Sequence, residues 1–249
     1  MSSAPHPSDE RWLPAAVLRP AAGNAFESTV EQLATAIRLG VFADGEQLPP
    51  ERELAARLGV SRMTLREAIA ALRESNMVVT RRGRGGGTRI RWAGEIPGEG
   101  GPDRQRSAPR RGADLEDALV FRAVVEPGAA AATAGRSLAG DQRAWLVQCR
   151  AEVENAPDEG AHRVADARLH LAIATCSGSP MLVEAVTRAQ AAMQELLGAI
   201  PVLPRNIVHS NAQHEAIVKA ILDGDPTRAR AAMEEHCAAT AALLRGLLG

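Results

Sequence analysis

Four side chains in the second half of the sequence have the types and the spacing of a metal site. Asp166 and His170 lie four residues apart, so on one helix both side chains project from the same face and can reach one ion. His214 and His236 follow on two further expected helices. Three imidazoles and one carboxylate suit zinc, nickel, manganese or another divalent transition metal better than calcium, which prefers oxygen ligands. The four residues are therefore candidate ligands of one ion.

The spacing leaves other roles open for these and neighbouring residues. The sequence does not reveal whether three helices converge, and histidines on alanine-rich helices are often simply exposed. His162 lies four residues before Asp166 and is a further candidate ligand, although an exposed histidine one turn from a site needs no role. Arg122 is a candidate for binding a carboxylate, and a salt bridge with Glu126 is its alternative role.

Arginines in the first half of the sequence share one flank of an expected helix over residues 61–75. The apolar residues of this segment recur on one face, which must pack inward. Arg62, Arg66 and Arg73 then share a neighbouring flank. A planar guanidinium can bind a guanine edge or a phosphate through two hydrogen bonds. The flank therefore favours DNA binding, and a solvated basic face is the alternative.

A winged helix-turn-helix would position these arginines. Periodicity and capping residues predict helices at 26–39, 51–58 and 61–75, a turn at 43–45, and strands at 77–80 and 88–91. Gly59 and Val60 join the second and third helices in a tight turn, and a basic, glycine-rich tip joins the strands. This tip lacks the spacing and the following helix of a phosphate-binding P-loop. Two helices held at a fixed angle and followed by a hairpin place one helix in the major groove.

The remaining segments divide the sequence into four parts. Ala- and Leu-rich stretches predict six helices, near 114–135, 141–155, 159–177, 180–199, 206–223 and 226–248. Gly, Pro and charged residues without apolar periodicity predict an interdomain linker. We therefore expect a mainly α protein with a mobile arm over 1–25, the winged helix-turn-helix over 26–91, the linker over 92–112 and an all-α helical bundle over 113–249.

Composition and charge narrow the class of protein. Aromatic residues make up only 2% of the chain, which disfavours stacking platforms for single-stranded nucleic acid. The three scattered cysteines suit a reducing cytosol, and neither a signal peptide nor an apolar run of ~20 residues is present, so we expect a cytoplasmic protein without membrane contact. Eleven basic and eight acidic residues give segment 26–91 a charge of +3, whereas segment 112–249 carries −5. This division suggests that the first part faces a polyanion.

Residue identities in the first part resemble a known family. The runs GEQLPPERELA, from Gly45 to Ala55, and LGVSRMTLREA, from Leu58 to Ala68, resemble the DNA-binding domain of GntR-family transcription regulators. Met63 departs from the pattern, because relatives often carry a small hydroxyl residue there. The resemblance implies that double-stranded operator DNA is contacted by Arg52, Ser61, Arg62, Thr64, Arg66, Arg82 and Gly83.

The second part resembles the helical effector domain, called FCD, of the FadR subfamily. The resemblance rests on RAVVEPGAA from Arg122, DARLHLAI from Asp166, HEAIVKAI from His214, and the segment from Gly224 to His236. In metal-binding members the matching positions supply one Asp and three His ligands, which implies the ligand set Asp166, His170, His214 and His236. Ser179 departs from the pattern, because relatives often carry Asn after the glycine.

These observations lead to one functional hypothesis with two alternatives. The hypothesis is a transcription regulator that binds a two-fold operator as a homodimer and responds to a small organic acid near the metal, with Arg122 as the effector-binding residue. A metal-dependent enzyme fused to a DNA-binding module is disfavoured, because catalytic zinc keeps an open position and a general base. Glu215 and Glu235 point about 100° away from the adjoining histidines. A purely structural metal is the other alternative.

Overall fold

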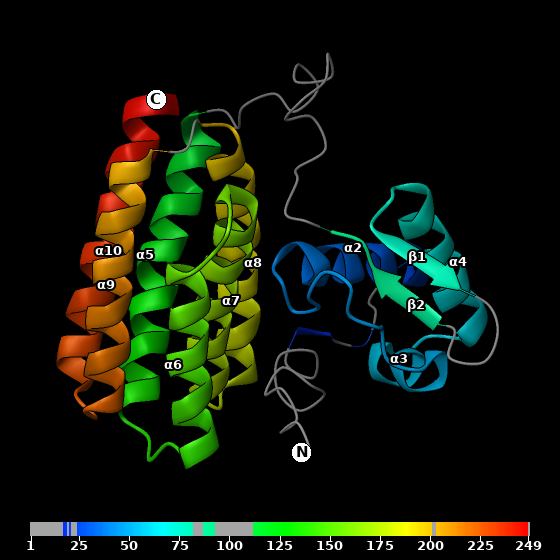
Figure 1. Ribbon diagram of the computed structural model, residues 1–249, viewed down its shortest axis with the longest axis horizontal. Helices are drawn as coiled ribbons and strands as arrows, with labels where there is room; N and C mark the ends of the chain where they lie inside the picture. Colours follow the sequence, from blue (N-terminus) through cyan, green and yellow to red (C-terminus); the bar gives the residue numbers. More distant parts are fainter. Residues whose placement is uncertain are drawn as a thin grey trace. The chain divides into compact units, whose positions relative to one another are not determined.

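The chain folds into two compact units, Met1–Gly94 and Glu95–Gly249, in the computed structural model. The structure describes residues 17–18, 20, 24–81, 87–92, 112–200 and 203–248. Most of the expected arm and linker lies outside these residues, so the four-part division of the sequence stays a prediction. Each unit is described by itself below (Figure 1).

The first unit contains three described helices and a two-stranded sheet. Its elements are α2 (Ala25–Arg38), α3 (Glu51–Leu58), α4 (Arg62–Glu74), β1 (Val78–Arg81) and β2 (Gly87–Ile90). Gly59 ends α3 with a φ of 64°, a left-handed conformation that favours glycine. The Ser61 hydroxyl then accepts a hydrogen bond from the Thr64 backbone N–H and caps α4. Local residue chemistry thus sets the turn between the two helices.

A further segment that the sequence did not predict extends the hairpin. β1 and β2 pair antiparallel, with Val78 opposite Ile90 and Arg81 opposite Gly87. The segment after the 43–45 turn also bonds to β2, because the Leu48 N–H donates to the Thr88 carbonyl and the Ile90 N–H donates to the Glu46 carbonyl. Sequence periodicity predicted only a turn in this region. The expected wing contacts Arg82 and Gly83 lie outside the described residues.

The second unit is a bundle of helices that run side by side (Figure 1). Ser179 and Asp158 accept hydrogen bonds at two helix starts, and prolines begin three of the helices. The six helices lie within two residues of their predicted bounds: α5 (Gly112–Ala134), α6 (Gly140–Glu154), α7 (Glu159–Cys176), α8 (Pro180–Gly198), α9 (Pro204–Leu222) and α10 (Pro226–Leu248). The predicted fold class, a winged helix-turn-helix followed by an all-α bundle, is confirmed.

The bundle buries polar side chains as well as an aliphatic core. Helix α10 packs on α5 and α9, and α7 packs on α6 and α8. Apolar residues such as Leu115, Leu196 and Leu244 fill one end of the bundle. Charged or polar side chains are costly to bury unless they are paired, yet nine of them from five helices are buried here: Arg122, Glu126, Thr133, Arg168, His170, Gln190, Gln213, His214 and His236. None of the described helices is long and apolar enough to span a membrane.

Candidate metal centre and candidate DNA interface

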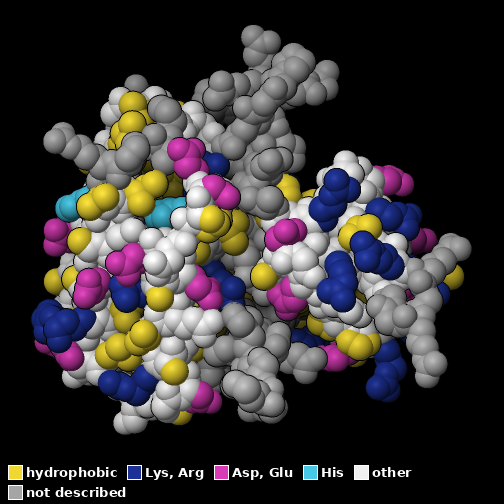
Figure 2. Space-filling model, viewed as in Figure 1, with side chains coloured by type: hydrophobic (Ala, Val, Ile, Leu, Met, Phe, Trp, Pro, Cys, Tyr) yellow, Lys and Arg dark blue, Asp and Glu magenta, His cyan; other side chains and the backbone are white. Residues whose placement is uncertain are grey.

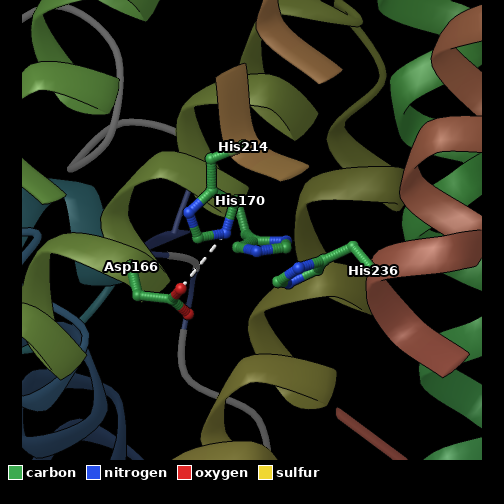
Figure 3. A group of neighbouring side chains, drawn as sticks. All are labelled: Asp166, His170, His214 and His236. Carbon is green, nitrogen blue, oxygen red and sulfur yellow. Dashed lines mark ion pairs between the residues drawn. The ribbon is translucent and has the colours of Figure 1, made fainter. Parts of the chain in front are cut away.

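Three helices of the bundle bring the four predicted ligands together. Asp166 and His170 come from α7, His214 from α9 and His236 from α10. Their side chains point toward one another, and one potential ligand atom from each lies within 4.8 Å of all the others (Figure 3). The three histidines are buried and Asp166 is partly exposed. The convergence that the sequence left open is therefore present in the structure.

Burial keeps His214 and His236 in the protonation state that binds metal. The ring centroids of His214 and His236 are 4.6 Å apart, and His214 Nε2 lies 3.2 Å from Asp166 Oδ1. Burial lowers the pKa of His214 to about 4. Burial, reinforced by the charge of His214, holds the pKa of His236 well below its usual value. Because metals bind neutral imidazole, no proton has to leave these two rings at neutral pH.

The unpaired nitrogens in the centre fit a metal ion. His170 Nε2 and His236 Nε2 are buried and make no hydrogen bond to any described residue. A buried polar atom without a partner costs about 1–3 kcal/mol. A divalent ion would satisfy both nitrogens, and nitrogen with carboxylate oxygen is a donor set that zinc, nickel and manganese accept. The cluster could therefore hold a metal.

Two further residues orient the imidazoles. Glu126 Oε2 lies 2.9 Å from His170 Nδ1, and Gln213 Oε1 lies 3.2 Å from His236 Nδ1. With Nδ1 occupied in this way, Nε2 is the nitrogen left to face an ion. Sequence reasoning considered Glu126 only as a salt-bridge partner and missed Gln213. The available sequence signal for Glu126 was a single carboxylate within an apolar run. No comparable signal pointed to Gln213.

Arg122 forms the salt bridge that the sequence allowed as an alternative. Its Nε donates to Glu126 Oε2 over 2.9 Å, and Gln190 Nε2 donates to the other carboxylate oxygen over 2.6 Å. Burial alone would raise the pKa of Glu126, but Arg122 and then His170 lower it below its usual value. Burial alone would lower the pKa of Arg122, and Glu126 raises it. Both side chains are therefore charged at neutral pH.

A small cavity lies beside the centre. It has a volume of about 90 Å³. Arg122 Nη1 and His162 Nε2 are buried and have no hydrogen-bond partner among the described residues. The four ligand atoms converge without His162, so the structure places this histidine in the cavity wall instead. The residues that contribute polar groups to the wall include Arg122, His162, Asp166, Gln190, Asn206, Ser210, His236 and Thr240.

The first unit presents most of the predicted DNA contacts at its surface. Arg52, Arg62 and Arg66 are exposed on α3 and α4. Figure 2 shows Lys and Arg side chains gathered on the visible face of this unit. Ser61 is exposed, whereas Thr64 is half-buried and its hydroxyl lies 2.8 Å from that of Ser61. Both hydroxyls therefore also stabilise the start of α4.

Residues 26–89 match the family described as "Bacterial regulatory proteins, gntR family", and residues 117–239 match the FCD domain. Together with the winged helix-turn-helix and the helical bundle, these matches define a transcription regulator rather than an enzyme. An Escherichia coli K12 protein named "Putative L-lactate dehydrogenase operon regulatory protein" is 34% identical over 77% of this chain and 75% of its own length. The chain belongs to the GntR family of bacterial regulators and carries an FCD domain.

A further relative agrees with this membership, and two solved structures share the fold. The HTH-type transcriptional repressor NanR of Escherichia coli K12 is 30% identical over 84% of this chain and 80% of its own length. Two solved structures share the fold: E. coli McbR/YncC, with a TM-score of 0.53 and 19% identity over 90% of this chain and 99% of that chain, and a GntR regulator from Rhodococcus sp. RHA1, with a TM-score of 0.52 and 20% identity over the same shares.

Proposed function

We propose that the protein is a cytoplasmic, homodimeric repressor whose operator binding is modulated by a small carboxylate bound near a divalent transition metal. The observation that carries this proposal is the convergence of Asp166, His170, His214 and His236 beside a cavity with a buried guanidinium. The repressor named NanR among the relatives supports the direction of regulation. When bound, the metal supplies an electrophilic centre for an effector oxygen.

The cavity supports an effector of limited size and negative charge. A cavity of about 90 Å³ is several times larger than the minimum that one water molecule needs, and it is suited to a small molecule. Arg122 Nη1 is buried and unpaired, and a guanidinium is well suited to a carboxylate. His162 Nε2 is available for a second polar group. A short hydroxy or keto acid meets these requirements, in keeping with the relative named for an L-lactate dehydrogenase operon.

The DNA-binding part of the proposal rests on Arg52, Arg62 and Arg66, with Ser61 and Thr64 at the start of α4 and Arg82 and Gly83 in the wing. An effector can change operator affinity only if it binds two arrangements of the protein with different affinities. A metal that is purely structural would stabilise the bundle without an exchangeable position for the effector. An effector-binding metal and a purely structural metal therefore differ in whether the effect of an organic acid on the protein requires the metal.

Thermal unfolding with and without a chelator tests the proposal. We expect about one divalent ion per chain by elemental analysis, and a higher melting temperature when a short hydroxy acid such as lactate is added to the metal-loaded protein. The chelator should remove the effect of the acid as well as that of the metal. An acid that acts equally well after chelation would contradict binding at the metal.

A pair of histidine variants on α9 separates the metal from the rest of the fold. His214→Ala should lose the ion, melt at a lower temperature and no longer respond to acids. His209→Ala is the matched control, because His209 is exposed on the same helix and lies outside the cluster. Equal metal content in both variants would overturn the proposed ligand set.

A further inference from the structure

An acidic residue contacts the helix that we expect to enter DNA. Arg66 Nε on α4 donates a hydrogen bond of 2.7 Å to Glu51 Oε2, at the first position of α3. Both side chains lie at the surface, with 64% of Arg66 and 38% of Glu51 exposed. The guanidinium makes no other hydrogen bond to a described residue, so the donors on Nη1 and Nη2 are not used within the described part of the chain. The contact therefore restrains the arginine without covering its two terminal nitrogens.

Neither stability nor attraction to DNA explains a carboxylate at this position. An exposed ion pair contributes little to folding, because solvent screens it and two long side chains are ordered. A negative charge beside a DNA-binding arginine repels phosphates and lowers affinity for any duplex. Glu51 also lies at the positive end of α3, but Glu53 in the same turn already supplies a carboxylate there. A role in orienting Arg66 accounts for the presence of Glu51 despite this lower affinity for DNA.

The geometry of the guanidinium indicates what this arrangement achieves. Arginine has a long side chain with many rotamers and a rigid fork of N–H donors. A bond at Nε selects one orientation and leaves the Nη1–Nη2 edge, which can donate to O6 and N7 of guanine in the major groove. A side chain that is already ordered loses less entropy when it binds. A mobile arginine would instead reach neighbouring phosphates, which carry no sequence information.

We propose that Glu51 is a positioning residue that directs Arg66 toward one guanine in each half of the operator. Glu51 lowers general affinity for DNA and raises the preference of the regulator for its own sequence. The inference rests on the proposed contact between Arg66 and DNA. It adds that sequence preference at this base pair depends on Glu51, whose carboxylate does not itself contact the base.

The test compares specific and non-specific binding for four variants. The full-length wild-type protein first selects duplexes from a pool with a randomised centre. Affinity is then measured for the selected duplex and for a scrambled duplex of the same composition. The variants are Glu51→Ala, Glu51→Gln, Arg66→Ala and the control Glu53→Ala. Glu53 is a suitable control because it lies two residues further along the same helix turn and pairs with Arg57, not with Arg66.

The substitution of Glu51 by Ala is expected to change the affinities for the two duplexes in opposite directions. Glu51→Ala should bind the selected duplex more weakly and the scrambled duplex more tightly, which lowers the ratio of the two affinities about fivefold or more. The loss should concentrate at one base pair per half-site. Glu51→Gln should keep most of the ratio, because its amide oxygen still accepts a hydrogen bond from Nε. Glu53→Ala should leave the ratio unchanged.

Two outcomes would overturn the inference, and they are distinguishable. If Glu51→Ala binds both duplexes more tightly by the same factor, Glu51 acts only through its charge, whereas a loss of preference in Arg66→Ala would still support the DNA contact. If Arg66→Ala keeps the affinity and preference of the wild type, the proposed contact itself is wrong. Because Glu51 is at the surface, circular dichroism and melting curves are expected to match those of the wild type.

Discussion

At the scale of single residues, Gln213 is expected to tune the metal centre without being a ligand. Its Oε1 lies 3.2 Å from His236 Nδ1 and fixes which ring nitrogen faces the ion. Replacing a residue in such a role typically lowers metal affinity about 10- to 100-fold. Gln213→Leu should therefore weaken zinc binding by about that factor in a titration against a competing chelator. Gln148→Leu, on α6 and next to Glu152, should leave the affinity unchanged. Equal affinities in the two variants would contradict this role.

Also at the residue scale, the buried thiols should be inert in the folded protein. Burial raises the pKa of both Cys149 and Cys176 to about 12. At pH 8 roughly one thiol in ten thousand is then the reactive thiolate. A thiol reagent at pH 8 should modify these two residues slowly in the native protein and rapidly after denaturation. Rapid modification of either residue, mapped by mass spectrometry in protein that keeps its native circular dichroism, would contradict the burial.

At the scale of elements, the turn between α3 and α4 depends on a backbone conformation. Gly59 has a φ of 64°, where a residue with a Cβ is strained by about 1–2 kcal/mol. Gly59→Ala should lower the stability of the first unit by about this amount. Gly128→Ala is the opposite case, because Gly128 is helical and a Cβ would meet nothing within 4 Å. That variant should stabilise the second unit by about 0.5–1 kcal/mol. Denaturant unfolding, followed separately for each unit, checks both the expected loss and the expected gain of stability.

At the scale of the whole molecule, we expect two copies to pair through the exposed face of α5. Val120 and Val124 are spaced one turn apart, and 58% and 67% of their respective surfaces are exposed, with Phe121 beside them. A two-fold operator requires a self-complementary surface between two copies. Val124→Glu should yield a monomer by sedimentation and reduce affinity for a palindromic duplex more than for a half-site. The control Val208→Glu, at a position on α9 that is 71% exposed, should stay dimeric. A dimeric Val124→Glu variant would place the interface elsewhere.

The sequence by itself predicted the helices and the candidate ligand set. Capping residues such as Ser61, Asp158 and Ser179 act within one turn of the chain, so their effect can be predicted from neighbours alone. The i, i+4 spacing of Asp166 and His170 fixes their common face for the same local reason. The resemblance to FCD domains named His214 and His236 as partners.

Only the tertiary structure decided how these residues meet. Convergence of α7, α9 and α10 depends on how the whole bundle packs, which no local spacing encodes. The same holds for Gln213 beside His236, for the pairing of Leu48 with Thr88, and for Glu51 beside Arg66, which is 15 residues away. Each contact joins residues that are distant in the chain, and in the candidate metal centre burial among several helices also lowers the pKa of His214 and His236.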